Sequence, residues 1–257
     1  MSTVGKALTL LNLFSAEKPE LGLVELARGA GYDKATTRRL LVSLAEHGFV
    51  EQDPESRLYR IGASLTRFAR IREARLPLLQ TALPFIRKLA EETGETVHLS
   101  EAGNGTLATI YVEHPARANR VNVDVGGLLP LHSTASGIAY LSHARDAVVK
   151  AALASPLTAF TAYTATDRAA VVAAMDAARR RGYSTSEQGY EEGVYSVAAA
   201  ILGADGFAIG TLAIAAPLVR TPKAKAIERG KAVMIAAREI TQLLNGDRIN
   251  TVAKASA

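Results

Sequence analysis

Cysteine is absent from this sequence of 257 residues, which excludes disulfide bonds and thiolate metal sites and is compatible with a reducing compartment. Long hydrophobic runs are absent as well. The apolar N-terminal stretch MSTVGKALTLLNLF is interrupted by Lys6, lacks a small-residue cleavage site and is far shorter than the roughly 20 apolar residues that span a bilayer. These absences predict a protein with no membrane partner and a cytoplasmic location.

Signatures of catalysis and of cofactor binding are also missing. The five histidines lack metal-site spacing, so each is expected to be a surface or a satisfied buried residue, and EAGNGT lacks the Gly-Lys-Ser/Thr ending of a phosphate loop. The segment HSTASG contains His132, Ser133 and Ser136, but Thr134 occupies the first glycine position of G-x-S-x-G. We predict no cofactor, no metal ion and no catalytic residue, with a small-molecule hydrolase that uses Ser136 as an alternative.

Charge of one sign is not in large excess. Thirty Lys and Arg residues against 25 Asp and Glu residues give a formal charge of +5, which is small for a protein that holds nucleic acid over its whole surface. The distribution is more informative, because the segment from Lys34 to Arg39 carries no acid and Glu73 is the only acid between Arg57 and Arg75. Positive charge is therefore concentrated in short segments.

The length and the hydrophobic content of 48% predict two domains. In the first, residues 1–62, apolar spacing and capping residues predict a helix over 4–14, a short helix that ends at Gly31, and a third helix between Asp33 and Gly48. The segments FVEQD, PESR and LYRI then read as strand, turn and strand. This order predicts a winged helix-turn-helix. The expected inner face of its hairpin comprises Phe49, Leu58 and Ile61.

The third helix carries the predicted nucleic-acid contacts. At 100° per residue, Leu40, Leu41 and Leu44 face the core, so positions 35, 38, 39 and 42 point outward. Near the N-terminal end, which helix-turn-helix proteins insert into the major groove, guanidiniums can donate to guanine or clamp a phosphate. The candidate DNA-binding residues are Lys34, Ala35, Thr36, Thr37, Arg38 and Arg39, with Arg57 at the wing tip. A merely solvated helix face, or a winged helix that serves only protein contacts, is the alternative.

The rest of the chain predicts a linker helix over 63–75 and an α+β domain over 76–257. Pro77 marks the end of the linker helix or the start of the next helix. Strands are expected at 95–102, 106–114, 194–203 and 207–216, and a further strand that enters a loop is expected within 121–130. Helices are expected at 133–142, 145–154, 167–181 and 223–244. The apolar positions of the last helix include Ile227, Val233, Ile235, Ile240 and Leu243.

Several ordered motifs give the chain a family resemblance over nearly its whole length. KALTLLNLF, LVELARGAGYDKATTRRLLVSLAEHGFVEQD and YRIGASL resemble the N-terminal pattern of IclR-family transcriptional regulators. GETVHLS, GGLLPLHSTASGIAYLS, RRRGYSTSE, EGVYSVAAAI and AIAAPLVR resemble the C-terminal signatures in the right order. The resemblance implies a ligand-responsive DNA-binding regulator of a catabolic operon, with a GAF-like effector-binding domain. It also implies operator DNA as partner, dimers through the DNA-binding region and often tetramers through the sensor domains.

The resemblance further implies an effector pocket at the start of the helix after PLH and on two late strands. The implied effector-binding residues are Val121, Ala135, Ser136, Glu187, Ser196, Ala213 and Ala215. The chain departs from the family pattern at Gly189, where Glu is common, at Ser196, where Cys is usual, and at the two strand alanines, which replace hydroxyl residues. Fewer polar groups favour an aromatic or partly apolar acid or amide over a two- or three-carbon oxoacid.

Overall fold

The structure is a computed structural model that describes residues 1–15, 17–73 and 77–255. The chain divides into two compact units, Met1–Leu76 and Pro77–Ala257, each with its own hydrophobic core. Positions 74 and 75 of the predicted linker helix lie outside the described residues. Among the described helices, none is both long and apolar enough to cross a bilayer.

The N-terminal unit is a winged helix-turn-helix, as predicted. The Asp33 carboxylate accepts a hydrogen bond from the Thr36 amide at 2.8 Å and caps the third helix, and Gly31 ends the second in the left-handed conformation with φ 69°. The elements, in chain order, are α1 (Thr3–Leu11), β1 (Glu20–Leu21), α2 (Leu23–Ala30), α3 (Lys34–Glu46), β2 (Val50–Gln52), β3 (Tyr59–Ile61) and α4 (Ala63–Glu73). The strands pair antiparallel in the order β1-β3-β2.

The predicted inner face of the hairpin is wrong by one residue at Phe49 and Leu58. Val50 and Tyr59 are buried in the core, whereas the Ile61 side chain is 41% exposed and Phe49 and Leu58 are only half-buried. Side chains alternate between the two faces of a strand, so a shift of one residue reverses the face that Phe49 and Leu58 occupy. Ile61 pairs with Val50 and shares the face of Tyr59, but it is exposed at the end of β3. The edge strand β1 is absent from the sequence prediction because two residues have no readable periodicity.

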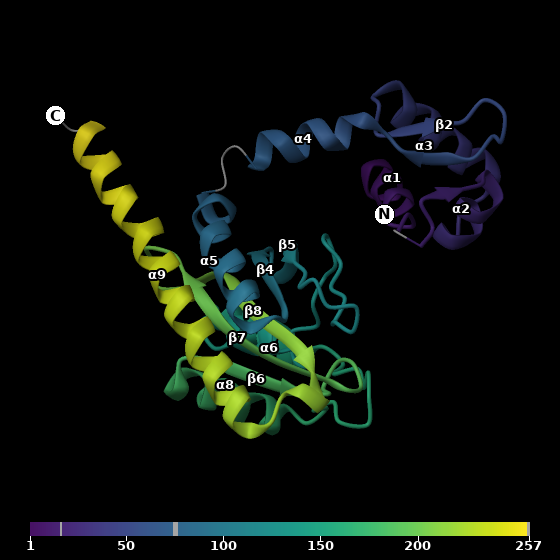
Figure 1. The fold of residues 1–257 in the computed structure, drawn as a ribbon. Helices are drawn as coiled ribbons and strands as arrows, with labels where there is room; N and C mark the ends of the chain where they lie inside the picture. Colours follow the sequence, from purple (N-terminus) through teal and green to yellow (C-terminus); the bar gives the residue numbers. More distant parts are fainter. Residues whose placement is uncertain (16, 74–76, 256–257) are drawn as a thin grey trace. The chain divides into compact units, whose positions relative to one another are not determined.

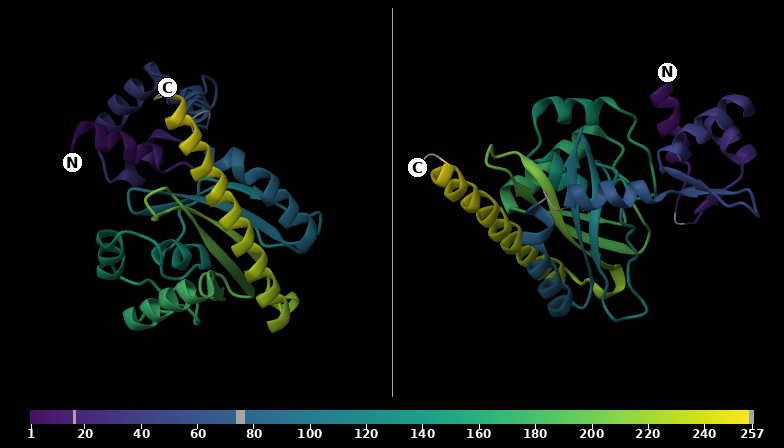
Figure 2. Two further views of the ribbon diagram at one scale, coloured as in Figure 1. Left: turned by 90° about the vertical axis from the view of Figure 1, so that its left-hand side faces the viewer. Right: turned by 90° about the horizontal axis from the view of Figure 1, so that it is seen from above.

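The C-terminal unit is an antiparallel sheet in the order β5-β4-β8-β7-β6 with helices on both faces, as Figures 1 and 2 show. Helices α5 and α9 pack on one face, and α6, backed by α8, packs on the other. The elements are α5 (Pro77–Thr93), β4 (Thr96–Gly103), β5 (Thr106–Glu113), α6 (Ala135–Leu141), α7 (Asp146–Ala154), α8 (Arg168–Arg181), β6 (Ser184–Glu187), β7 (Val194–Leu202), β8 (Ala208–Pro217), the 3-10 turn η1 (Leu218–Arg220) and α9 (Lys223–Ala255).

The strand predicted over 121–130 does not form. This segment is a loop whose pairing with β5 is limited to an isolated bridge between Ala108 and Leu128, with backbone hydrogen bonds to Leu107 and Thr109 beside it. A turn at Gly126, whose φ is 87°, interrupts the apolar alternation that precedes it. Strand β6, in contrast, was not expected from its polar sequence STSE. The loop leaves space above the sheet instead of adding a strand to it.

The C-terminal helix α9 extends beyond the predicted end at residue 244. Its predicted apolar set is also only partly right, because Ile227, Ile235 and Leu243 are exposed. The face that packs on the sheet and α5 mixes small and branched side chains, since alanine lets a helix lie close to its neighbours. Its buried members are Ala226, Val233, Ala236, Ala237, Ile240 and Leu244.

A buried ion cluster joins the beginning of β4 to the beginning of α9. The Glu95 side chain is 1% exposed and accepts hydrogen bonds from Arg220 Nη2 at 2.8 Å and Arg229 Nη2 at 2.9 Å. Arg220 also donates to the carbonyl oxygen of Asn119 at 2.9 Å. A buried charge is costly without its partner, so Glu95 holds Arg220 in place. Arg220 in turn fixes the loop after β5 to the sheet through Asn119.

Candidate functional site

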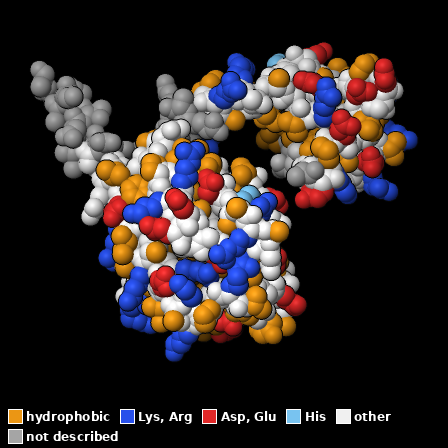
Figure 3. Space-filling view, in the orientation of Figure 1, with side chains coloured by type: hydrophobic (Ala, Val, Ile, Leu, Met, Phe, Trp, Pro, Cys, Tyr) orange, Lys and Arg blue, Asp and Glu red, His pale blue; other side chains and the backbone are white. Residues whose placement is uncertain are grey.

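One face of α3 presents cationic side chains to solvent. Lys34, Ala35, Arg38 and Arg39 are exposed, whereas Leu40 is buried, as the helical spacing predicts. Among the residues that the structure describes, neither arginine has a hydrogen-bond or ion-pair partner. Figure 3 shows acidic, basic and hydrophobic side chains mixed on the visible face of the N-terminal unit, in keeping with its modest charge. Any contact with a polyanion therefore depends on local groups such as this pair.

Thr37 is a correction to the predicted set. Its side chain is fully buried and its hydroxyl donates to the Asp33 carbonyl oxygen at 2.8 Å, so it does not reach a phosphate. Thr36 is half-buried, and its amide donates to the Asp33 carboxylate. That hydrogen bond lowers the pKa of Asp33. The cap therefore occupies one of the first-turn amides of α3, which is not available to a phosphate.

The wing tip is a structured turn. The Asp53 carboxylate accepts hydrogen bonds from the amides of Ser56 at 2.7 Å and Glu55 at 3.1 Å. Arg57 follows with φ 61°, a left-handed conformation that few non-glycine residues adopt, and its side chain is exposed. The turn thus holds a cation at the tip of the hairpin, where the sequence predicts it.

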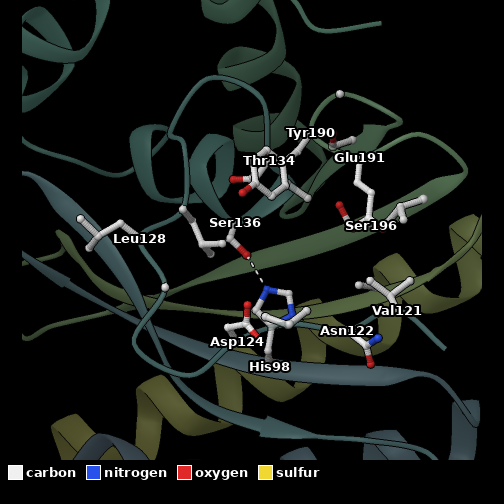
Figure 4. A pocket seen from close by; sticks show the side chains of 18 residues that line it. His98, Val121, Asn122, Asp124, Leu128, Thr134, Ser136, Tyr190, Glu191 and Ser196 are labelled. Atoms are coloured by element: carbon white, nitrogen blue, oxygen red, sulfur yellow. Dashed lines mark hydrogen bonds between the residues drawn. The ribbon is translucent and has the colours of Figure 1, made fainter. Parts of the chain in front are cut away.

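A cavity of about 270 Å³ lies over the sheet of the C-terminal unit (Figure 4). Its walls come from the loop 121–129, the beginning of α6, the loop after β6, and strands β4, β7 and β8. Helix α6 lies close to the preceding loop because residue 137 is glycine: a Cβ there would lie 2.4 Å from the Leu131 carbonyl oxygen. Thr134 caps α6 by accepting a hydrogen bond from the Gly137 amide at 2.9 Å.

Five of the seven predicted effector-binding residues line this cavity. They are Val121, Ala135, Ser136, Ser196 and Ala215. Glu187 does not, because Ser186 of the same strand faces the cavity beside its partner Ser196, and the next residue along the strand points the opposite way. Ala213 lies on the correct face but is fully buried beneath α6 with Ala135.

His98 is a cavity residue that the sequence analysis missed. It lies on β4, is 5% exposed, and places Nε2 3.2 Å from the Ser136 hydroxyl, while Nδ1 has no hydrogen-bond partner among the described residues. Burial lowers the pKa of His98 to about 4, so the imidazole is neutral at physiological pH. The alternation in ETVHLSEA puts Thr96 and His98 on one face of β4, but which face lies under the cavity depends on how β4 pairs with β8.

An aromatic wall borders the cavity. Tyr190 lines it and packs edge-on against Phe160 with 5.0 Å between ring centroids, and Phe160 lies 5.9 Å from the His132 ring. The loops that carry these rings are joined, because the Thr164 hydroxyl donates to the Gly189 carbonyl oxygen at 2.7 Å. An apolar or aromatic part of a ligand therefore has a preformed surface to contact.

The loop over the cavity is anchored at two backbone carbonyls. The Thr96 hydroxyl donates to the Val121 carbonyl oxygen at 2.7 Å, and the buried Glu95 cluster holds Asn119 through Arg220. Both bonds join the loop to groups near the beginning of β4 or the end of β8. The cavity wall is thus part of the packed unit and not a loose cover.

The Ser136 and His98 pair does not form a catalytic triad within the described residues. A serine nucleophile needs a base that is itself oriented by a third group, and Nδ1 of His98 has no such partner. A pKa of about 4 also makes His98 a weak proton acceptor at neutral pH. No cluster of three or more His, Asp or Glu side chains suited to a metal ion occurs among the described residues.

A winged helix-turn-helix with an exposed cationic helix face, carried on the same chain as a unit with a ligand-sized cavity, defines a ligand-responsive DNA-binding regulator. Family models agree with this class: residues 3–54 match the IclR helix-turn-helix domain and residues 73–242 match the bacterial transcriptional regulator IclR C-terminal domain. The chain belongs to the IclR family of transcriptional regulators. It is a regulator and not an enzyme.

Known relatives are similar over almost the whole chain. The acetate operon repressor of Salmonella typhimurium is 29% identical over 255 residues, which cover 96% of this chain and 92% of the repressor. The crystal structure of an IclR regulator from Silicibacter sp. TM1040 is 40% identical, with a TM-score of 0.85 and coverage of 95% and 96%. An IclR homologue from Microbacterium hydrocarbonoxydans, solved with 4-hydroxybenzoate, shares the fold at 22% identity and a TM-score of 0.81, with coverage of 94% and 100%.

Proposed function

We propose that α3 enters the major groove of an operator and that Arg38 and Arg39 contact bases or phosphates there. The observation that carries this proposal is the exposure of two adjacent guanidiniums with no partner among the described residues, near the N-terminal end of a capped helix. Lys34, Ala35 and the half-buried Thr36 complete the face. Arg57, exposed at the wing tip, contacts the DNA backbone in this proposal.

The regulator acts as a homodimer or homotetramer in this proposal. One winged helix buries too little surface for tight operator binding, so two half-sites are read together. Exposed apolar side chains on α1 and α4 support an interface between copies of the N-terminal unit, because unpaired apolar surface favours association. These side chains are Val4, Leu8, Phe68 and Ile71.

The cavity of the C-terminal unit is the proposed effector site. Its volume of about 270 Å³ and its aromatic wall suit a small, partly apolar molecule. The 4-hydroxybenzoate in the Microbacterium homologue has this character. Effector binding shifts the balance between arrangements of the DNA-binding units by its difference in affinity for them, typically about 1–3 kcal/mol. Helix α4 is the proposed transmitter, and a catabolic operon is the proposed target.

The salt dependence of operator binding tests the DNA-binding role. Gel shifts with promoter DNA from the regulator's own gene are expected to give a log-log slope of affinity against salt steeper than about −4, since a dimer neutralises several phosphates. A slope near zero would contradict the proposal and would favour a winged helix that contacts only protein. Lys150→Ala, an exposed charge change on α7 in the other unit, serves as the matched control and is expected to leave the slope unchanged.

A further inference from the structure

The charged side chains around the cavity are acidic wherever the structure describes them. Asp124, in the loop over the sheet, and Glu191, in the loop before β7, are exposed and lie at opposite sides of the cavity in Figure 4. The described lining includes no Lys or Arg. Exposed carboxylates are negative at neutral pH. A ligand with its own carboxylate would therefore bind between two like charges that no Lys or Arg of the described lining offsets.

The cavity floor holds a neutral imidazole with unused hydrogen-bonding capacity. One nitrogen of His98 faces the Ser136 hydroxyl, as the dashed line in Figure 4 marks, and the other has no partner among the described residues although the side chain is 95% buried. Leaving a buried polar atom unpaired is costly, and a ligand group that reaches it recovers that cost. An uncharged donor or acceptor suits a neutral ring, whereas a carboxylate gains no ion pair from it.

The start of α6 contributes the backbone amides of Ala135 and Ser136, which carry no formal charge and can donate to a neutral carbonyl as well as to an anion. The Gly137 amide is already bonded to Thr134, and the Ser133 carbonyl oxygen accepts a hydrogen bond from Ser186 at 2.7 Å. The other polar side chains of the lining are hydroxyls and one carboxamide, Asn122. Such groups pair with neutral donors and acceptors without requiring a charge on the ligand.

We propose that the effector is a partly apolar molecule that is uncharged in the cavity and presents an amide or hydroxyl group to His98 and Ser136. This inference rests on the proposed function, because it takes the cavity to be the effector site. The sequence allows either an acid or an amide as the effector, and this inference favours the amide. Tyr190 and Val121 supply the apolar contacts, and His98 selects the polar group.

Matched pairs of an acid and its amide test the ligand class on the full chain. Benzoate with benzamide, 4-hydroxybenzoate with 4-hydroxybenzamide, and nicotinate with nicotinamide are titrated by calorimetry at neutral pH. The amide is expected to bind at least about tenfold more tightly than its acid in the pairs that bind. An acid that equals or exceeds its amide overturns the inference, and so does a protein that binds no member of any pair.

Two pairs of variants separate charge from hydrogen bonding. Glu191→Gln is expected to raise acid affinity about threefold or more and to leave amide affinity within about twofold, because it removes a like charge. Glu192→Gln, an exposed neighbour outside the lining, is the control and changes neither. His98→Phe is expected to lower amide affinity about tenfold, and His98→Gln to restore part of it. Unchanged acid affinity in Glu191→Gln, or unchanged amide affinity in folded His98→Phe, contradicts the inference.

Operator binding distinguishes this inference from the proposed function. If the acids bind more tightly while the wild-type chain still shows salt-dependent operator binding, the proposed ligand class is wrong and the proposed DNA-binding role is supported. If the amides bind more tightly but the chain has no affinity for promoter DNA, the DNA-binding role of α3 is wrong and the cavity chemistry stands.

Discussion

The cationic face of α3 and the cavity of the C-terminal unit are built in opposite ways. The helix face comes from consecutive residues, Lys34 to Arg39, and its arginines have no partner among the described residues. The cavity is assembled from β4, α6, β7 and β8, and its polar residues His98 and Ser136 are buried against each other. Changes to the helix face are therefore expected to alter binding without altering folding. Changes beneath the cavity alter both.

Breaking the buried ion cluster should give the largest effect on stability. Glu95→Ala leaves Arg229, whose side chain is 8% exposed, without its carboxylate partner. Loss of one partner of a buried ion pair costs about 3–5 kcal/mol, or about 10 °C in the melting temperature of a unit this size. Calorimetric melting checks it. A fall of less than about 1 kcal/mol would show that the cluster does not anchor the cavity wall.

Stability at acid pH is expected to depend on the cavity residue His98. Its pKa is about 4 in the folded chain, below the ordinary value of 6.5, so the unfolded chain binds the proton more readily. The contribution of neutral His98 to the free energy of unfolding is therefore fully present above pH 6.5 and is lost as the pH falls towards 4. The total loss is about 3 kcal/mol. Urea unfolding between these pH values measures the loss. His143, whose pKa is also lowered by burial, contributes as well, so the difference between wild type and His98→Gln isolates His98.

Adding a methyl group at Gly189, in the loop that borders the cavity, is expected to have a smaller effect on stability. A Cβ at Gly189 would lie 2.6 Å from the Ser133 carbonyl oxygen and 2.7 Å from the Ser186 hydroxyl. Gly189→Ala is therefore expected to cost about 2 kcal/mol and to weaken ligand binding, because the loop that carries Tyr190 must shift. Chemical denaturation and calorimetry measure the two effects. Gly193→Ala tests backbone conformation alone, since its φ is 75° and a Cβ there meets nothing within 4 Å.

The wing tip should show the smallest effect. Arg57→Gly removes a cation but relieves a left-handed backbone at φ 61°, so stability is expected to rise by about 0.5–1 kcal/mol. Operator affinity should fall modestly, with the log-log salt slope reduced by about one. Arg57→Asn, which tolerates the same conformation, gives the charge effect with less change in backbone freedom. A stability loss in Arg57→Gly would contradict this account of the turn.

The sequence predicts local features well and non-local ones poorly. Gly31 ends α2, and Asp33 with the leucine spacing defines α3, because capping and helical periodicity act within a few residues. The exclusion of Glu187 and the inclusion of His98 depend on how β4, β6, β7 and β8 pair, and pairing register is not readable from one strand. Thr37 fails for another reason: a threonine hydroxyl that can reach a phosphate can also bond to its own helix.

Operator affinity of the double variant Arg38→Ala, Arg39→Ala tests the central claim most directly. Affinity is expected to fall at least about 100-fold, since each contact is worth about 1–3 kcal/mol, while melting temperature and ligand binding stay at wild-type values. Lys150→Ala, measured beside it, is expected to bind as wild type. Operator affinity of the double variant within a few-fold of wild type, in a folded protein, would contradict the claim that this face of α3 contacts DNA.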